Sequence, residues 1–219
     1  MPATLRTEEL PIPARYKLLT GAIVPRPIAF VSTISTEGSH NLAPYSFFNG
    51  LGSNPMTLLF CPANNADGSE KDTLKNCKPT SEGGTGEFVV NIATTHYANK
   101  VSAAAEELPH GQSEFTLTGL TPEPAETVAP PRLAESPISF ECRTLQIVRT
   151  NPGQPAGGNL VIGEVLATHI HDDQLVNERH HVDPERLAAI GRMAGLTYCH
   201  TNNRFDIPRG AAALETHPL

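Results

Sequence analysis

The chain has 219 residues, a net charge of −7 and a sequence pI near 5.7, and 18% of its residues are charged. This length fits one domain, residues 1–219, with a sizeable core, and the acidic balance argues against a nucleic-acid partner held by phosphate contacts. Its four cysteines form no C-x-x-C pair, which excludes a thioredoxin-like centre and a zinc ribbon. With no signal-peptide pattern and no 18-residue apolar run, we expect a reducing, cytoplasmic location without a membrane span.

Prolines and short apolar runs dominate the first third of the chain. Pro11 and Pro13 predict an extended lead-in over residues 1–24, with at most a single turn at Tyr16–Leu19. Because Pro44 cannot donate to a ladder, the second of three expected strands belongs at an edge or a bulge. The third is nearly continuous in apolar residues and is expected to be buried on both faces or to lie inside a barrel. These strands are predicted at Ile28–Ile34, Leu42–Phe48 and Met56–Phe60.

The middle of the chain alternates between helical and extended patterns. KDTLKNCK predicts a short helix that Asp72 or Thr73 would cap. Phe88–Ala93 predicts a strand, and the alanine-rich Tyr97–Glu107 predicts a helix. The polar, proline-rich stretch Leu108–Pro131 is typical of a functional loop or a lid, although its piece Phe115–Leu120 has the pattern of an edge strand.

The last third predicts a long hairpin of Ile138–Val148 and Leu160–Ile170, then a short helix at Arg186–Ile190 and a strand at Leu196–Cys199. Six or more short strands joined mostly by hairpins, with two or three helices, predict a β-barrel-centred α+β architecture. The chain lacks regular strand–helix alternation, G-x-G-x-x-G and G-x-x-x-x-G-K-[ST], so neither a Rossmann nor a P-loop fold is supported.

Two stretches combine the groups that a small-molecule site needs. Lys71, Asp72 and Thr73 place a cation, a hydroxyl and helix N-terminal N–H groups together, which suits a phosphate, although an ordinary helix cap on a solvated surface is the commoner case. The stretch Asn41–Asn49 mixes amides, a hydroxyl and aromatic rings, which suits a flat ligand such as isoalloxazine. Its aromatic residues are equally compatible with a strand core.

Three further features have weaker alternatives. Arg26, held extended between two prolines, suits a fixed phosphate or ribityl contact, although a lone exposed arginine is commoner. His169 and His171 share a strand face near two aspartates, but solvated histidines are the usual finding in such a polar region. Cys61 and Ser46 have no spacing-based partner for nucleophilic catalysis, so no catalytic residue is assigned.

The motifs PRPIAFVST, NLAPYSFFN, SNP, KDTLKN, GEFVVNIA, AESPISFECR and VIGEV occur in the order seen in the flavin reductase-like, FMN-binding split-barrel proteins. The chain resembles this family over about residues 21–207, in the branch that holds flavoredoxin and the reductase components of two-component flavin monooxygenases. The sequence differs from the usual pattern in a longer Ser81–Gly86 connection and in the polar Leu108–Pro131 stretch.

The resemblance implies a six-stranded antiparallel Greek-key split barrel with flanking helices, a homodimer, and FMN near the subunit interface. It implies an NAD(P)H-dependent oxidoreductase, with hydride delivered to flavin N5 and electrons passed to oxygen, a partner monooxygenase or another redox partner. By motif, it places the flavin ring along Asn41–Ser46 and the phosphate at Lys71–Thr73. The residues carried over as cofactor-binding are Arg26, Asn41, Ala43, Pro44, Tyr45, Ser46, Cys61, Lys71, Asp72, Thr73 and Arg192.

Two alternatives stay open at this point. One is a flavoredoxin-like FMN electron carrier that does not use NAD(P)H. The other is a non-enzymatic barrel that binds a small ligand, or a metal through His169 and His171.

Overall fold

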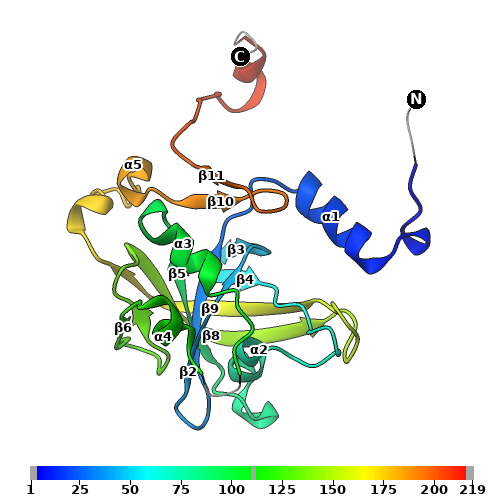
Figure 1. The fold of residues 1–219 in the computed structure, drawn as a ribbon. Helices are drawn as coiled ribbons and strands as arrows, with labels where there is room; N and C mark the ends of the chain where they lie inside the picture. Colours follow the sequence, from blue (N-terminus) through cyan, green and yellow to red (C-terminus); the bar gives the residue numbers. More distant parts are fainter. Residues whose placement is uncertain (1–3, 110–111, 216–219) are drawn as a thin grey trace.

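A computed structural model describes residues 4–109 and 112–215, with an antiparallel sheet at its centre (Figure 1). The strands of this sheet are β1 (Ala29–Ile34), β2 (His40–Tyr45), β3 (Phe48–Ser53), β4 (Met56–Phe60), β5 (Glu87–Ile92), β8 (Ile138–Arg149) and β9 (Asn159–Ile170). Their order is β2-β1-β5-β8-β9-β4-β3, with antiparallel pairing throughout. Two small sheets pair β6 (Pro122–Glu123) with β7 (Arg132–Leu133), and β10 (Ile190–Arg192) with β11 (Tyr198–His200).

The sheet curls strongly, because its two edge strands are joined by two residues. In a flat sheet, six strand spacings would separate β2 from β3 by roughly 29 Å. Ser46 and Phe47 connect these strands, and the three Cα steps from Tyr45 to Phe48 span at most about 11 Å. The two edges are therefore brought close together without being paired to each other in the ladder. This is the geometry of a split barrel.

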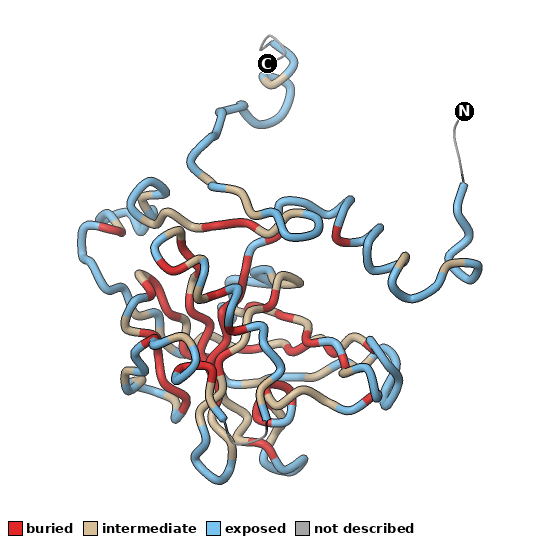
Figure 2. Tube along the Cα trace, viewed as in Figure 1, coloured by how far each residue is buried: buried red, intermediate tan, exposed pale blue. Residues whose placement is uncertain are grey.

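The curled sheet has one apolar core inside it and another between its outer face and the helices. Phe60 and Phe88 meet inside with ring centroids 5.2 Å apart, and Ala29 and Val31 of β1 join them. On the other side of β1, Phe30 packs with Tyr97 in the second core. Because both faces of β1 are covered, its apolar run is nearly continuous. Figure 2 shows these buried segments gathered in the sheet.

The described residues form five α-helices: α1 (Ile12–Ala22), α2 (Asp72–Cys77), α3 (Ala98–Ala103), α4 (Glu114–Thr118) and α5 (Pro184–Leu187). Helix α1 corrects the prediction of an extended lead-in. Pro11 is its N-cap residue and Pro13 lies in its first turn, where a missing N–H breaks no helical hydrogen bond. No helix of the described residues is long and apolar enough to cross a membrane.

The strand count and one burial pattern also differ from prediction. The main sheet has seven strands rather than six, since residues 42–48, predicted as one strand, belong to β2 and β3 with a break between them. Strand β3 reads FNGLGS, and most of it is exposed. Its sequence therefore has no apolar alternation that would predict a strand. In β4 only Leu58 and Phe60 are buried, and both belong to the core inside the curled sheet. The strand is therefore not buried on both faces, whereas the alternative of a strand inside a barrel agrees with this core. Pro44 does lie on an edge strand, as predicted.

The predicted hairpin is confirmed as β8 and β9, and β5 as the strand near residues 88–93. The helices near 97–107 and 186–190 are present but shorter, as α3 and α5, and the last strand is β11. Phe115–Leu120 forms most of α4 instead of a strand. The hydroxyl of Ser113 accepts a hydrogen bond from the Phe115 N–H at this helix's start, and Gly119 ends it with a positive φ.

Candidate functional site

The described residues line an open cavity of about 490 Å³ between strand β2, the start of helix α2 and the segment that follows α3. This volume lies in the range of pockets that hold small molecules and cofactors. Four stretches of chain and one residue of α4 form its lining. The lining residues are Asn41, Ala43, Pro44, Tyr45, Asn65, Ala66, Asp67, Lys71, Asp72, Thr73, Ala104, Ala105, Glu106, Glu107, Leu108 and Glu114.

A hydrogen-bonded group joins β2 to α2 on one side of the cavity. The Asn41 side-chain amide donates to the hydroxyls of Thr73 at 2.8 Å and Thr33 at 3.1 Å. The hydroxyls of Thr73 and Tyr45 are also hydrogen-bonded to each other. Burial raises the pKa of Tyr45 far above its usual range, and the Thr73 contact offsets only part of this rise. Tyr45 is therefore a neutral phenol, able to donate or accept a hydrogen bond.

The backbone of β2 is itself a source of polar groups, because β2 is an edge of the sheet. It pairs only with β1, so N–H and C=O groups on its outer side take no part in the ladder. One of them, the Leu42 N–H, donates to the buried Glu114 carboxyl at 2.8 Å. An edge strand with this exposure can offer hydrogen bonds to the edge of a flat heterocycle.

Lys71 brings a positive charge to the cavity from the residue that precedes α2. Its ammonium lies 3.8 Å from the carboxylate of Glu107, and its side chain is 35% exposed. The expected side-chain cap of α2 is absent: Lys71 occupies the N-cap position without a side-chain cap, and Asp72 pairs with Lys75 at 2.8 Å. Since α2 has only six residues, Lys71 rather than a helix dipole is the main attraction for an anion here.

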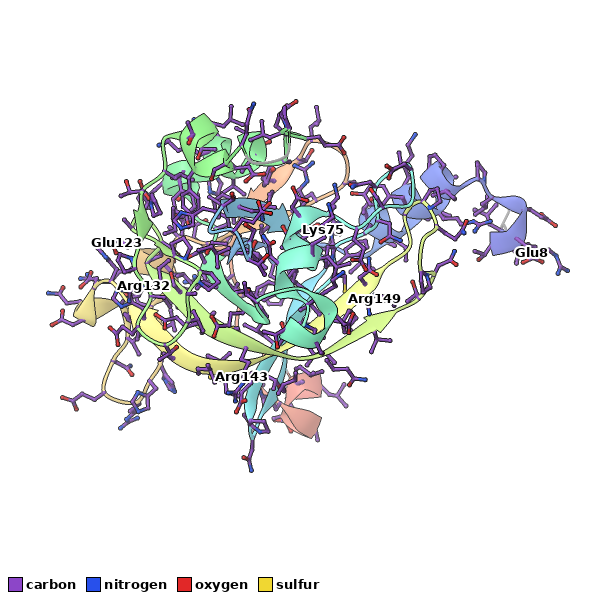
Figure 3. The ribbon with its side chains drawn as sticks, turned by 90° about the horizontal axis from the view of Figure 1, so that it is seen from below. Glu8, Lys75, Glu123, Arg132, Arg143 and Arg149 are labelled. Carbon is purple, nitrogen blue, oxygen red and sulfur yellow. The ribbon has the colours of Figure 1, made fainter. Side chains whose placement is uncertain are left out.

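The wall formed by residues 65–67 is anchored to the tip of the β8–β9 hairpin. Asn159, which is buried, donates to the Pro62 carbonyl at 3.0 Å and to the Asn64 side-chain oxygen at 2.8 Å. Glu70 pairs with Lys78 at 2.9 Å and with Arg149 at 3.2 Å. In Figure 3 α2, marked by Lys75, lies across the concave side of the β8–β9 pair, between Arg132 and Arg149. These contacts fix the backbone next to Lys71.

Of the predicted cofactor-binding residues, the structure brings seven to this cavity: Asn41, Ala43, Pro44, Tyr45, Lys71, Asp72 and Thr73. It places Arg26, Ser46, Cys61 and Arg192 outside the lining of the cavity. The sequence analysis did not predict four residues that line or support the site, because nothing in their local sequence indicates the distant groups that they contact. They are Glu114, Asn64, Asn159 and Glu70.

Arg26 is a structural tie. Its guanidinium is buried and donates to the Ser46 hydroxyl at 3.1 Å and to the main-chain carbonyls of Thr20, Ile23 and Met193. These bonds join α1, the β2–β3 connection and the end of β10. Arg192, whose backbone pairs with that of Arg26, lies with its guanidinium over the Tyr198 ring. Cys61 is half-buried, and burial raises the pKa of its thiol.

The histidine cluster gains no further support. His169 lies on β9 opposite Ser139, and His171 just beyond the strand's end. Among residues 4–109 and 112–215, no group of three or more histidine, cysteine, aspartate or glutamate side chains is placed to share a metal ion.

Comparison with known proteins agrees with the family resemblance of the sequence motifs, over most of the chain. The family model described as flavin reductase like domain matches residues 21–198. An uncharacterized protein of Deinococcus radiodurans is 38% identical over 206 residues, which cover 91% of this chain and 86% of the relative.

Two solved structures are similar in both sequence and fold. Nitrilotriacetate monooxygenase component B from Bacillus cereus is 33% identical, with a TM-score of 0.86 and coverage of 94% of this chain and 99% of that one. The 2-nitrobenzoate 2-nitroreductase NbaA of Pseudomonas fluorescens is 28% identical, with a TM-score of 0.81 and coverage of 95% and 97%. The chain thus belongs to the flavin reductase-like family.

Proposed function

We propose that the protein is an FMN-binding, NAD(P)H-dependent flavin reductase that passes electrons on to an acceptor, such as a partner monooxygenase, in the cytoplasm. The observation that carries this proposal is the convergence of β2 and Lys71 on one cavity in a flavin reductase-like chain. The similarity to a monooxygenase component B supports a partner enzyme as one acceptor, and the similarity to a nitroreductase supports a small organic acceptor as another.

The donor set of the cavity fits a phosphorylated flavin. The outer edge of β2 would meet the hydrogen-bonding side of the ring, while Ala43 and Pro44 give apolar contact. Lys71 would hold the phosphate, exchanging its 3.8 Å contact with Glu107 for a charge-assisted hydrogen bond. Bound flavin supplies the redox chemistry by accepting hydride from the nicotinamide. The chain's own work is binding, orientation and exclusion of water.

An absorption spectrum of the purified protein tests this function. Titration with FMN should perturb the visible flavin band, and anaerobic addition of NADH or NADPH should bleach it. Bleaching by a reduced redox protein but by neither nicotinamide would instead identify an electron carrier. If FMN and FAD leave both the spectrum and the unfolding temperature unchanged, the protein does not bind flavin and the proposal is wrong.

We further propose that two copies of the chain assemble as a homodimer. Helix α1 and the C-terminal segment project from the sheet and are largely exposed (Figures 1 and 2). Apolar side chains remain exposed along α1 and directly after it, including Tyr16 at 59%, Leu19 at 49% and Ile23 at 56%, and Phe205 of the C-terminal segment is 65% exposed. Monomeric proteins rarely leave contiguous apolar surface of this kind in water, and a second copy of the same chain would cover it.

Sedimentation equilibrium at micromolar concentration should give twice the chain mass of 23.5 kDa. Introducing charge on α1 with Leu19→Glu and Ile23→Glu should shift the mass to that of one chain, because two carboxylates would have to be buried. Leu145→Glu, at a similarly exposed site on β8, is the control and should leave the dimer intact. A wild-type mass of one chain would refute the dimer.

A further inference from the structure

The carboxyl groups that line the cavity outnumber its cations. Lys71 is its one cationic lining residue among the described residues, and five carboxyl groups accompany it. A phosphate monoester carries close to two negative charges at neutral pH. Unless at least one carboxyl is neutral in the complex, repulsion would oppose binding of the phosphorylated ligand. The carboxyls are those of Asp67, Asp72, Glu106, Glu107 and Glu114.

Glu114 differs from the other four in its burial and in its contacts. Asp67, Glu106 and Glu107 are exposed, and Asp72 is paired with Lys75. Glu114 is only 8% exposed, and no ion pair joins it to a described lysine or arginine. Burial raises the pKa of Glu114 and the nearby Asp72 adds to the rise, although hydrogen bonds from the Leu42 and Glu114 N–H groups oppose it. Burial therefore favours the neutral form of the Glu114 carboxyl.

Within the described ranges, the elements packed around Glu114 bring no cation other than Lys71 to the lining of the cavity. Helix α2 contributes Asp72, and β2 contributes Tyr45, which burial keeps neutral. The rim after α3 adds the carboxylates of Glu106 and Glu107. His40 of β2 stacks its ring against Phe115, the next residue along α4, with centroids 6.1 Å apart, and does not line the cavity.

We propose that Glu114 is a ligand-contacting residue that takes up one proton from solvent when a phosphorylated flavin binds. The inference rests on the proposed function and extends it. In the complex the neutral carboxyl keeps its acceptor contact with the Leu42 N–H through one oxygen and uses the other, as O–H, to donate to the ligand. A charge that would repel the phosphate becomes a hydrogen-bond donor. Glu114 thereby favours phosphorylated flavins at lower pH.

Glu114→Gln separates this role from a structural one. Glutamine can still accept from the Leu42 N–H, so the edge of β2 keeps its partner, and its amide is neutral at every pH. We would measure the dissociation constants of FMN for the wild type and the variant between pH 5.5 and 8.5. The ligand's own phosphate titrates near pH 6, but it affects both proteins equally and cancels in their ratio.

The ratio of the wild-type to the variant dissociation constant should rise with pH, by up to tenfold per unit, the limit for uptake of one proton. Calorimetry of FMN binding in two buffers of different ionisation enthalpy should show proton uptake that Glu114→Gln abolishes. Riboflavin, which lacks the phosphate, should show a weaker effect. The control Glu37→Gln removes an exposed carboxylate that does not line the cavity and should leave the pH dependence of the wild type unchanged.

A ratio that does not change with pH, or equal proton uptake by the two proteins, would overturn the role of Glu114 while leaving flavin binding in place. Failure of both proteins to bind FMN at any pH would overturn the proposed function instead. If circular dichroism shows that Glu114→Gln does not fold, proton uptake on FMN binding would be measured instead in Lys71→Met, which keeps Glu114. There the same proton uptake with FMN should persist at weaker affinity, and its absence would count against the proposal.

Discussion

Glu141→Gln is expected to lower the free energy of unfolding by about 3–5 kcal/mol, the usual cost of removing one partner of a buried ionic group. Glu141 lies on β8 and is 1% exposed. Its carboxylate accepts hydrogen bonds from the N–H groups of Glu126 and Thr127 and from the Thr127 hydroxyl, at 2.7–3.1 Å. The Arg132 guanidinium lies 3.8 Å away. A glutamine would turn an amide NH₂ toward these donors, and it would remove the negative charge beside the Arg132 guanidinium.

Chemical denaturation, with the transition followed by circular dichroism, measures this loss. Glu164→Gln is the matched control, since its pair with Arg143 is also held in the β8–β9 hairpin but lies at the surface. Exposed pairs contribute about 0–1 kcal/mol, so this variant should unfold close to the wild type. Equal effects of the two substitutions would mean that the buried network adds nothing beyond a surface contact.

Acidification should remove the same contribution. Burial opposes ionisation of Glu141, but the hydrogen bonds from Glu126 and Thr127, together with the charge of Arg132, outweigh it and hold the pKa of the carboxyl below its usual range. The stabilisation is therefore complete above the unfolded-state pKa, about 4.3, and is lost as the pH falls through the lower folded-state pKa. The stability difference between the wild type and Glu141→Gln should shrink over that interval.

Asn41→Ala is expected to raise the dissociation constant of FMN about tenfold to a hundredfold. The side-chain amide of Asn41 donates to the hydroxyl of Thr73, a residue that is 1% exposed and that in turn contacts Tyr45. A buried polar group that loses its partner costs about 1–3 kcal/mol, and 1.4 kcal/mol corresponds to a factor of ten. Thr33 would keep its hydrogen bond from Asn76, so the loss falls on the cavity side.

Flavin fluorescence during titration gives the affinity, and a parallel thermal melt separates it from stability. Asn49→Ala is the control, since Asn49 ends the same NLAPYSFFN motif but is exposed on β3. Unchanged FMN affinity in Asn41→Ala would show that the Asn41–Thr73–Tyr45 group does not shape the binding site.

The Leu108–Pro131 stretch illustrates the limit of reading a loop from composition. Its polar and proline-rich sequence is typical of a functional loop or a lid. In the structure, Glu141 accepts hydrogen bonds from the N–H groups of residues 126 and 127, and Glu87 accepts one from the Ala129 N–H at 2.8 Å. Leu108, at the start of the stretch, and Glu114, at the start of α4, line the cavity. These anchors lie on strands that are distant in sequence, so the pattern within the stretch could not reveal them.

The local sequence pattern predicted those strands whose burial repeats along the chain itself. Alternation and bounding turns located β1, β5 and the β8–β9 hairpin, because a half-buried strand repeats every two residues. The ordered motifs led to the family, and with it to both Asn41–Tyr45 and Lys71–Thr73. Whether these two stretches meet depends on the tertiary structure. Strand β2 is an edge of the sheet, and helix α2 packs across the concave side of the sheet.

Tertiary structure alone decided what the polar residues do. The rigid position of Arg26 between two prolines suggests a ligand contact. Its guanidinium instead donates hydrogen bonds to carbonyls of α1 and its C-terminal end and to the carbonyl of Met193. Glu114 carries no motif and nevertheless reaches the cavity, because the edge of β2 needs an acceptor there. A buried polar group must be paired, and its partner comes from wherever the folded chain brings one. Sequence spacing therefore identifies strands and families, while the identity of the groups that meet a ligand is settled by packing.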